Sequence, residues 1–564
     1  MKKFSSFLLI VFLIIFLLAE GYFVTAINTP EEYIWNPGVE GGIPDVPNVV
    51  NVLDFGAKGD GVTDDYEAFK AAVSAVTEGG GVFIPEGNYL IKSPLTFNKP
   101  VVLRGEGTDK THLLIDHNSN AFEIITYKRG AWQKLAGGFT MGSNRLLVEG
   151  GSSFKPGQYV EIQQENNPDV MYTLPEWNVN WAEGAIGQIA KIVSVEGNTI
   201  IIDNPLKHDY KQNLNPVIRT QGFVEYVGFE DFSVERLDRS DTSIFYFKNT
   251  ANCWVKNVHS KLARKCHVHV NTGYRIEIRD SFFDDATDWS GGGHGYGVQL
   301  WFHSTNCLIE NNIFKHLRHS MMAQLGSNGN VFGYNYSIEP YQSEGGNWTP
   351  ADISLHGHYP HANLFEGNIV QKITVSDYWG PSGANTFLRN RIETEGIRIE
   401  DSSNYQVFLG NELVKGSLLW DTDSRYPHLI DPSTFLIHGN YINGSIEWDE
   451  RVSGHIIPVS YYHNSKPSFY KSLEWPSIGA DRLNGTIPAK ERYLNQGILY
   501  GDLNGDNTVD SLDCVLLGRY LLEIINEFPN LNGINTADLN RDGIINTLDY
   551  ALLNRYVLGV IDGL

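Results

Sequence analysis

The segment NCLIENNIF, residues 306–314, sets a pattern that recurs along the middle of the chain. Similar segments follow it: NGNVFGYNYS (328–337), HANLFEGNIV (361–370), ANTFLRNRI (384–392) and YQVFLGNEL (405–413). Aligning one turn residue of each segment, and extending the alignment in both directions, yields the series Asn257, Asp280, Asn312, Asn335, Asn368, Asn390, Asn411 and Asn440. Four of its seven spacings are 21–23 residues, and the other three are 29–33 residues.

A repeat of this length predicts a solenoid. Three short strands and three turns fit into a coil of 21–23 residues, whereas a propeller blade needs about 40 residues. Asn tolerates the left-handed turn conformation, and Asn side chains stacked from coil to coil can also form a hydrogen-bonded ladder. We therefore expect an all-β solenoid with a single strand on each side of every coil.

The segment before the repeats begins with NVLDFGAKGDGVTDDYEAFKAAV (51–73), which predicts a capped amphipathic helix. GGGVFIPEGNYLI (79–91) then predicts a strand, a turn and a second strand. Together these stretches resemble the opening of the pectate-lyase-like right-handed β-helix proteins. The resemblance implies a right-handed parallel β-helix whose N-terminal end is covered by the helix, and it leaves the reaction open.

The composition suits a β-rich protein with sugar-stacking surfaces. The chain has 564 residues and a formal net charge of −23, so it lacks the basic surface of a nucleic-acid-binding protein. Only 19% of the residues are charged, whereas 56 residues are Gly and 12% are aromatic. Four Cys residues are too few for a disulfide scaffold.

The N-terminus has the features of a secretory signal. Lys2 and Lys3 precede an apolar run at 7–19 that is too short to span a bilayer. Val24-Thr25-Ala26 then offers a small-residue cleavage site. We expect a signal peptide at 1–26, a Pro- and Gly-rich arm at 27–50, and a secreted product with no membrane attachment after cleavage.

The predicted β-helix occupies residues 51–490 and contains a β-rich insertion at about 140–220. Trp177 and Trp181 of this insertion either stack on sugars or pack the insertion, and packing is the simpler interpretation. Residues 491–497 are expected to link the β-helix to a separate module at 498–564.

That C-terminal module carries two calcium-binding sequences. GDLNGDNTVDSLD (501–513) and ADLNRDGIINTLD (537–549) place oxygen donors at positions 1, 3, 5, 7, 9 and 12 of an EF-hand-type loop. The donors are Asp502, Asn504, Asp506, Thr508, Asp510, Asp513, Asp538, Asn540, Asp542, Ile544, Asn546 and Asp549. Hard oxygen donors suit Ca²⁺, so two bound ions are expected. A further Ca²⁺ in the groove of the β-helix is left open.

Each loop leads into an apolar helix, VLLGRYLL (515–522) or ALLNRYVL (551–558). This duplicated loop–helix arrangement resembles a type I dockerin, the module that attaches cellulosomal enzymes to cohesins on a scaffold protein. The resemblance implies a cohesin partner, an extracellular cellulosome and a role in degrading plant cell-wall polysaccharide. It assigns cohesin contacts to Ser511, Leu512, Arg519, Thr547, Leu548 and Arg555. Position 11 of both loops is Leu where dockerins commonly have Thr, which leaves the identity of the cohesin open.

The two longest loops between regular coils concentrate polar and aromatic residues. DDATDWSGGGHGYGVQLWFH (284–303) and SEGGNWTPADISLHGHYPH (343–361) contain carboxylates, His and Trp, with FKHLRHSMMAQLG (314–326) between them. Alternate strand residues point outward, so stacked coils should align them in a column on one face. The column supplies the catalytic candidates Asp352, His356, Asp377, Arg398, Glu400 and His319, and the substrate-binding candidates Trp301, His303, Trp379 and Arg318.

Three functions are compatible with this column. A glycoside hydrolase needs a protonated acid and a second carboxylate, for which Asp352, Asp377 and Glu400 are available. A lyase on a uronic-acid polymer needs a base for the C5 proton and a cation for the uronate, which the His and Arg residues would provide. A non-catalytic polysaccharide-binding β-helix needs only the aromatic and cationic contacts. We expect an enzyme that cleaves O-glycosidic bonds in a plant cell-wall polysaccharide, with hydrolysis favoured over elimination.

Overall fold

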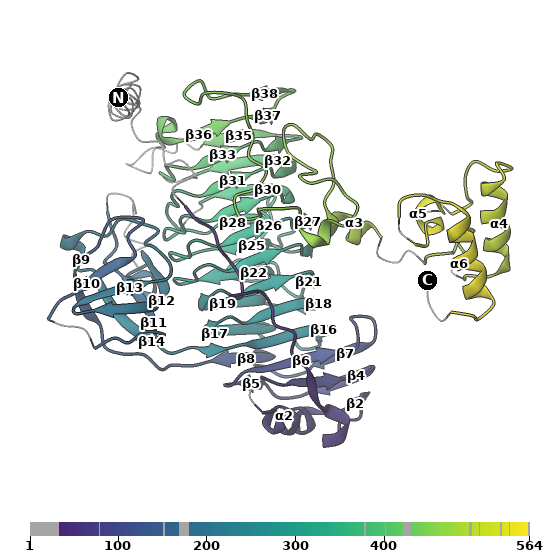
Figure 1. The fold of residues 1–564 in the computed structure, drawn as a ribbon, viewed down its shortest axis with the longest axis horizontal. Coiled ribbons are helices and arrows are strands. Elements are labelled where there is room, and N and C mark those ends of the chain that lie inside the picture. Colours follow the sequence, from purple (N-terminus) through teal and green to yellow (C-terminus); the bar gives the residue numbers. More distant parts are fainter. Residues whose placement is uncertain are drawn as a thin grey trace, which may run out of the picture.

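The computed structural model describes residues 33–77, 79–150, 153–168, 180–376, 379–400, 402–420, 430–495, 499–506, 508–530, 533–540 and 542–561. Most of these residues form a right-handed parallel β-helix, visible in Figure 1 as a stack of coils from the purple N-terminal end to the green C-terminal end. The predicted fold class is confirmed. The predicted signal peptide lies outside the described residues.

Three parallel ladders of strands run along the stack, because successive coils pair strand against strand. We call the first the site ladder: β5 (Leu95–Phe97), β8 (Phe122–Ile125), β17 (Phe245–Ala251), β19 (Cys266–Tyr274), β22 (Tyr296–Trp301), β25 (His319–Ala323), β28 (Ile353–Leu355), β30 (Ile369–Val375), β32 (Arg391–Ile399) and β35 (Ser417–Trp420).

The second ladder is formed by β1 (Asn48–Asn51), β3 (Gly81–Ile84), β6 (Val101–Gly105), β16 (Val227–Arg236), β18 (Trp254–Ala263), β20 (Glu277–Arg279), β23 (Leu308–Glu310), β26 (Val331–Gly333), β29 (Leu364–Glu366), β31 (Thr386–Leu388), β33 (Val407–Leu409) and β36 (Leu436–His438). The third contains β2 (Asp60–Asp64), β4 (Gly87–Ile91), β7 (Thr111–Ile115), β21 (Phe282–Ala286), β24 (Ile313–Lys315), β27 (Tyr336–Ile338), β34 (Glu412–Leu413) and β37 (Asn440–Ile442). The long strands β16, β18, β30 and β32 turn a corner and contribute to two ladders. The antiparallel strand β38 (Ser445–Glu447) pairs with β37.

Stacked side chains fill the interior of the coils. Phe332, Phe365, Phe387 and Phe408 follow one another with ring centroids 4.9, 5.0 and 5.1 Å apart and nearly parallel planes. Offset stacks of this kind add to the free energy gained by burying the rings. The repeated Phe of the sequence segments is therefore the core residue of each coil.

A ladder of amides runs beside this core. Side-chain amides donate to side-chain oxygens of the next coil at 2.8–3.1 Å in the series Asn312, Asn335, Asn368, Asn390, Asn411 and Asn440. The predicted hydrogen-bonded ladder is thus present over these six residues. In the first coils Ser281 occupies the position, so Asn257 and Asp280 are one residue out of register.

The left-handed turn conformation belongs to the residue before each ladder Asn. Asn311, Tyr334 and Arg389 have φ of 54°, 57° and 53°, while the ladder Asn residues have no positive φ. An extended Asn can direct its side chain along the stack, whereas the turn is made next to it. The prediction that one Asn serves both purposes is therefore corrected.

The helix α2 (Tyr66–Ala75) covers the N-terminal end of the stack (Figure 1). Phe69 and Ala72 are fully buried against the first coils, as the apolar face of the predicted helix requires. The end of a β-helix would otherwise leave the core open to water, so α2 acts as its cap.

A closed barrel interrupts the coils between β8 and β15 (Val224–Glu225), and Figure 1 shows it beside the stack. Its strands are β9 (Gln133–Gly137), β10 (Arg145–Val148), β11 (Tyr159–Gln163), β12 (Gly187–Glu196), β13 (Thr199–Ile202) and β14 (Val217–Gln221). Val160, Ile162, Ile200 and Ile218 belong to its own apolar core, separate from that of the coils.

The remaining elements are helical. The α-helices are α3 (Pro488–Leu494), then α4 (Ser511–Leu521), α5 (Gly533–Ala537) and α6 (Thr547–Val557) in the C-terminal module. Short 3₁₀ turns occur at Val52–Phe55, Asn180–Ala182, Gln212–Leu214, Pro432–Thr434 and Ser468–Tyr470. All four Cys residues are buried thiols without a disulfide.

Candidate functional site

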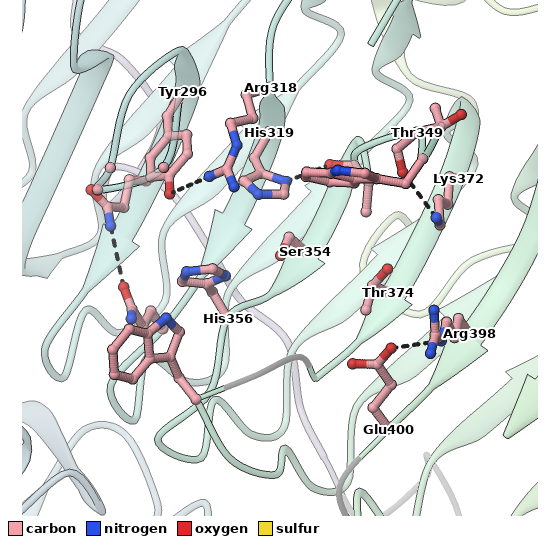
Figure 2. A pocket seen from close by; sticks show the side chains of 18 of the residues that line it. Tyr296, Arg318, His319, Thr349, Ser354, His356, Lys372, Thr374, Arg398 and Glu400 are labelled. Atoms are coloured by element: carbon pink, nitrogen blue, oxygen red, sulfur yellow. Dashed lines mark hydrogen bonds and ion pairs between the residues drawn. The ribbon is translucent and has the colours of Figure 1, made fainter. Parts of the chain in front are cut away.

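A cavity of about 590 Å³ opens on the site ladder, over β22, β25, β28, β30 and β32. Figure 2 shows its polar side chains projecting from successive coils. Strand register explains the arrangement: Gln299, Met322, Ser354, Thr374 and Arg398 are consecutive partners in the parallel ladder. Since the inward neighbours of this row are core residues such as Val298 and Ile353, the row itself faces outward.

The two stretched loops form walls of the cavity. Gly291, Gly292 and Gly293 line it from the first loop, and Trp348 and Thr349 line it from the second. The expectation that these loops flank a groove therefore agrees with the structure.

Three cations line the cavity, and each is oriented by a neighbour. Arg318 bonds the Tyr296 hydroxyl at 3.4 Å and pairs with Glu344 at 2.9 Å. Lys372 donates to the Thr349 carbonyl at 2.9 Å and pairs with Glu395 at 3.0 Å. Arg398 pairs with Glu400 at 2.6 Å (Figure 2). Among the described lining residues Glu400 is the one carboxylate, so the lining is net cationic.

Two imidazoles line the same cavity. The rings of His319 and His356 are 5.6 Å apart, and Tyr296 packs 5.3 Å from His319. Nδ1 of His319 is 2.8 Å from the Ala351 carbonyl oxygen, an acceptor, so Nδ1 carries a hydrogen. The neutral ring then has its lone pair on Nε2, which suits a base.

Aromatic side chains close one end of the cavity. Trp181 comes from the segment between β11 and β12 of the barrel, and Trp379 follows β30; both line the cavity. Their ring centroids are 6.0 Å apart at 64°. Trp181 also meets His358 edge to face at 5.0 Å.

The structure brings together six of the predicted site residues: His319, His356, Arg398, Glu400, Trp379 and Arg318. Asp377 lies outside the described residues. Asp352, Trp301 and His303 do not line the cavity.

Asp352 is fully buried where the chain turns from one ladder to the next. Its carboxylate accepts hydrogen bonds from the Ser337 hydroxyl at 2.5 Å and from the backbone N–H groups of Gln371 and Lys372 at 2.7 and 2.9 Å. Burial raises the pKa of Asp352 from 3.8 to about 6, although these hydrogen bonds oppose the rise. The outward orientation expected from strand alternation is corrected, because the strand β28 begins one residue later.

His303 is buried at the contact between barrel and coils. Nδ1 lies 2.9 Å from a Glu161 carboxylate oxygen and Nε2 lies 2.7 Å from the Gly184 carbonyl oxygen. Trp301 packs between Trp181 and His269 at centroid distances of 6.3 and 5.6 Å. His303 is fully buried away from the cavity lining, so the expected outward orientation of His303 is corrected. Trp301 is half-buried beside the lining residue Trp181, and its substrate-binding role stays a prediction.

Sequence reasoning missed Lys372, Tyr296, Gln324 and Trp348, which line the cavity. Lys372 could have been found, because it lies two residues before Thr374 on the same strand and alternation puts both on one face. Tyr296, at the start of β22, follows the glycine loop, and nothing in its sequence context marks its orientation.

In each C-terminal loop, the carboxylate at position 12 accepts hydrogen bonds from the backbone of the same loop. Asp513, at position 12 of the first loop, is fully buried and accepts from the N–H groups of Leu503 and Asn504 at 2.7 and 3.2 Å. Asp549 repeats these contacts in the second loop, with Leu539 and Asn540 at 2.8 and 3.1 Å. The side chains of Asp510 and Asn546 cap α4 and α6. This all-oxygen donor set fits Ca²⁺ in both loops.

Two known protein families match parts of the chain, one in the β-helix and one in the C-terminal module. Residues 49–146 match the family described as rhamnogalacturonase A/epimerase, pectate lyase-like. Residues 500–558 match the type I dockerin domain. The chain joins a pectate-lyase-like β-helix to a C-terminal type I dockerin.

Curated relatives match short parts of this β-helix–dockerin chain. Cellulase/esterase CelE of Acetivibrio thermocellus is 51% identical over 41 residues, which are 7% of this chain and 5% of the relative. Mannuronan C5-epimerase AlgE6 of Azotobacter vinelandii is 41% identical over 96 residues, or 15% of this chain and 10% of the relative. The glucan 1,3-beta-glucosidase of Cochliobolus carbonum is 42% identical over 87 residues, 13% of this chain and 11% of the relative. The chain thus spans about a tenth or less of the length of these relatives.

Solved structures resemble each part separately. The tailspike gp61 of Pseudomonas phage phi297 covers 68% of this chain and 66% of its own, with 13% identity and a TM-score of 0.48. The ScaB dockerin of Acetivibrio cellulolyticus, solved with a ScaC cohesin, is 42% identical over 12% of this chain and 90% of its own, with a TM-score of 0.12.

In the part of the chain that the structure describes, no three His, Cys, Asp or Glu side chains converge to hold a metal. The described helices include none with the length and apolar character needed to cross a bilayer.

Proposed function

We propose that the β-helix of this protein is an enzyme acting on an acidic plant cell-wall polysaccharide, and that its reaction starts with removal of the C5 proton of a uronate unit. The observation that carries the proposal is the charge of the cavity. The whole chain has a net charge of −23, yet Arg318, Lys372 and Arg398 line one cavity together with two His. Such a concentration of cations on an acidic protein suits a polyanion.

The chemistry follows from these groups. A cation beside the uronate carboxylate stabilises the charge that develops when the neighbouring C5 proton leaves. Nε2 of His319 is the candidate base, since Nδ1 already donates to the Ala351 carbonyl. The C5–H electrons then form a C4–C5 double bond, the C4–O bond breaks, and the leaving oxygen takes a proton, for which His356 is the candidate donor.

Hydrolysis, which the sequence favours, is the alternative. It requires two carboxylates that reach the glycosidic bond. Glu400 lines the cavity, whereas Asp352 is fully buried and is not among the described lining residues. One described lining carboxylate beside three cations and two His supports elimination over hydrolysis. Return of the proton to the opposite face of C5, without bond cleavage, would give epimerisation from the same first step.

One experiment separates these reactions. The full-length protein is incubated in D₂O with polygalacturonate, glucuronan, rhamnogalacturonan and xylan, while absorbance near 235 nm, reducing ends and deuterium at C5 are followed. Elimination predicts new absorbance and new reducing ends together. Reducing ends without absorbance mean hydrolysis, deuterium without either means epimerisation, and activity on neutral xylan alone would refute the proposal.

Variants test the assigned roles. His319→Ala should lower kcat by about 10²- to 10⁴-fold, the usual contribution of a general base. Lys372→Ala should chiefly raise KM for acidic polymers. Added salt screens the charges, so it should raise the KM of the wild type toward that of this variant. Lys415→Ala removes an exposed Lys outside the cavity and serves as the matched control.

We further propose that the dockerin binds two Ca²⁺ ions through the loop residues named above and attaches the enzyme to a cohesin in an extracellular cellulosome. Leu512 and Leu548 support this assignment, because their side chains are 58% and 61% exposed at equivalent positions of α4 and α6. Ser511, Arg519, Thr547 and Arg555 are exposed beside them. Leu512→Asp with Leu548→Asp should abolish binding to a type I cohesin while leaving polysaccharide turnover unchanged.

A further inference from the structure

We propose that Trp181, from the inserted barrel, and Trp379, from the coils, form a subsite for an uncharged sugar ring at one end of the cationic cavity. The substrate is then an acidic polysaccharide that also contains neutral sugars. This inference rests on the proposed function for the acidic part of the substrate, whereas the subsite itself rests on aromatic geometry.

The two indoles present apolar surface to the cavity. Trp181 remains 44% exposed although it touches Trp379, Trp301 and His358. Because Trp181 also lines the cavity, its exposed ring face is available to a ligand. Flat aromatic faces accept the C–H faces of pyranose rings through dispersion and weak C–H contacts.

The groups beside the indoles complement sugar hydroxyls. Gln299 donates to the side chain of Gln324 at 3.3 Å, and both line the cavity with Ser354 and Thr374. Amide and hydroxyl side chains of this kind both donate and accept hydrogen bonds. A ligand with many hydroxyl groups therefore suits the middle of the cavity.

Arg318 and the indoles lie at different ends of the strands. Arg318 and His319 stand at the start of β25, whereas Gln324 follows its end and Trp379 follows the end of β30. Five residues of strand separate His319 from Gln324, about 16 Å at about 3.3 Å per residue, which exceeds one sugar ring. On the indole side, Arg398 and Glu400 both line the cavity and their charges cancel at 2.6 Å. Glu344 and Glu395, the partners of Arg318 and Lys372, are not among the described lining residues. The indole end therefore favours an uncharged ring.

A buried network fixes the barrel segment that carries Trp181. Ala182 and Ala185 pack against Leu325 and Tyr359 of the coils. Gly326 has φ of +66°, and a Cβ there would lie 1.6 Å from the Ala185 carbonyl oxygen, so glycine permits this close approach.

Charged groups also fix the barrel segment that carries Trp181. His303 faces an acceptor at each ring nitrogen, the Glu161 carboxylate and the Gly184 carbonyl, so both nitrogens carry hydrogens. Arg219 pairs with the same carboxylate at 2.5 Å. Gly184 lies three residues after Trp181, so this network positions the indole before any ligand binds, which reduces the entropy lost on binding.

The test compares binding of two kinds of polymer by the full-length protein. Affinity electrophoresis is run in gels containing uronate-only polymers (polygalacturonate, glucuronan) or mixed polymers (rhamnogalacturonan, glucuronoxylan). Trp181→Ala should weaken retention by a mixed polymer about tenfold, the upper range for one aromatic contact. Retention by a uronate-only polymer should change less than twofold. Trp420→Ala is the matched control, because Trp420 is 40% exposed and does not line the cavity.

Each result decides the matter. Unchanged retention of Trp181→Ala overturns the subsite, and an equal loss on both kinds of polymer overturns its preference for uncharged rings. Retention of the wild type by none of the four polymers overturns the assigned substrate class. A selective loss in a protein that shows neither eliminase activity nor deuterium incorporation at C5 would refute the proposed reaction while supporting the subsite, so the two failures are distinguishable.

Discussion

The variant Asp352→Asn tests whether the carboxylate of Asp352 is structural or catalytic. One oxygen of Asp352 accepts from the N–H groups of Gln371 and Lys372, and the other accepts from the Ser337 hydroxyl. In Asp352→Asn the amide oxygen can keep both backbone bonds, and the amide nitrogen can donate to the Ser337 oxygen. The variant should therefore fold, with activity within about threefold of the wild type.

The stability of this variant should differ from the wild type in a pH-dependent way. Burial raises the pKa of Asp352 from 3.8 to about 6, so the native state holds the proton more tightly than the unfolded chain. Ionisation then opposes folding, and this contribution to stability falls as pH rises from about 4 to about 6. At about 1.36 kcal/mol per pKa unit the full effect is about 3 kcal/mol, with about 2 kcal/mol of it between pH 4 and pH 6.

Tryptophan fluorescence during urea unfolding measures the effect. All twelve Trp residues lie between positions 35 and 475, so the signal does not come from the dockerin. The difference in unfolding free energy between wild type and Asp352→Asn should shift by about 2 kcal/mol between pH 4 and pH 6, in the direction of a relatively weaker wild type at pH 6. A constant difference would refute the raised pKa. A hundredfold loss of activity at unchanged stability would show that Asp352 reaches the substrate.

Three more perturbations probe the ladder, the barrel contact and the dockerin. Asn368→Ala leaves buried amide and carbonyl groups of the ladder unpaired and should cost about 2–5 kcal/mol of unfolding free energy; an unchanged urea midpoint would contradict the ladder's role. Glu161→Gln should cost about 3–5 kcal/mol at pH 7, because His303 and Arg219 lose their buried counter-charge. Burial alone would raise the pKa of Glu161, but His303 and Arg219 lower it below 4.5. The stabilisation by ionised Glu161 is therefore present above pH 4.5 and disappears only as the pH falls further. If the difference in unfolding free energy between wild type and variant vanished between pH 7 and pH 5, the lowered pKa would be wrong. Removal of Ca²⁺ with EDTA should abolish cohesin binding and the helical circular dichroism of the dockerin, while the Trp unfolding transition stays in place; cohesin binding in excess EDTA would rule out the calcium assignment.

Much of the architecture could be predicted because short sequence patterns repeat along the chain. The spacing of the aligned turn residues identifies a basic coil of 21–23 residues with longer loops in some coils, and Asn312 to Asn440 do form the expected ladder. The prediction failed by one residue at Asn257 and Asp280, since a turn residue and a ladder residue are neighbours and spacing alone does not tell them apart.

The candidate site was predicted in part. Alternation correctly indicated His319, His356 and Arg398 as lining residues, and Ser354 and Thr374 of the paired strands line the same cavity. It failed at Asp352 and His303, which stand where strands begin or end and the period of two no longer holds.

By itself the sequence determined the coil length, the capped end of the β-helix and the oxygen donors of the dockerin loops, because each depends on residues close together in the chain. Only the tertiary structure decided which carboxylates reach the cavity and where Trp181 lies. Hydrogen bonds to a neighbouring coil hold Asp352 away from the cavity. Trp181 belongs to the barrel and packs beside Trp301 and Trp379, which lie more than 100 residues later in the sequence. Such contacts arise from stacking coils and packing an inserted domain against them, and no local pattern encodes them.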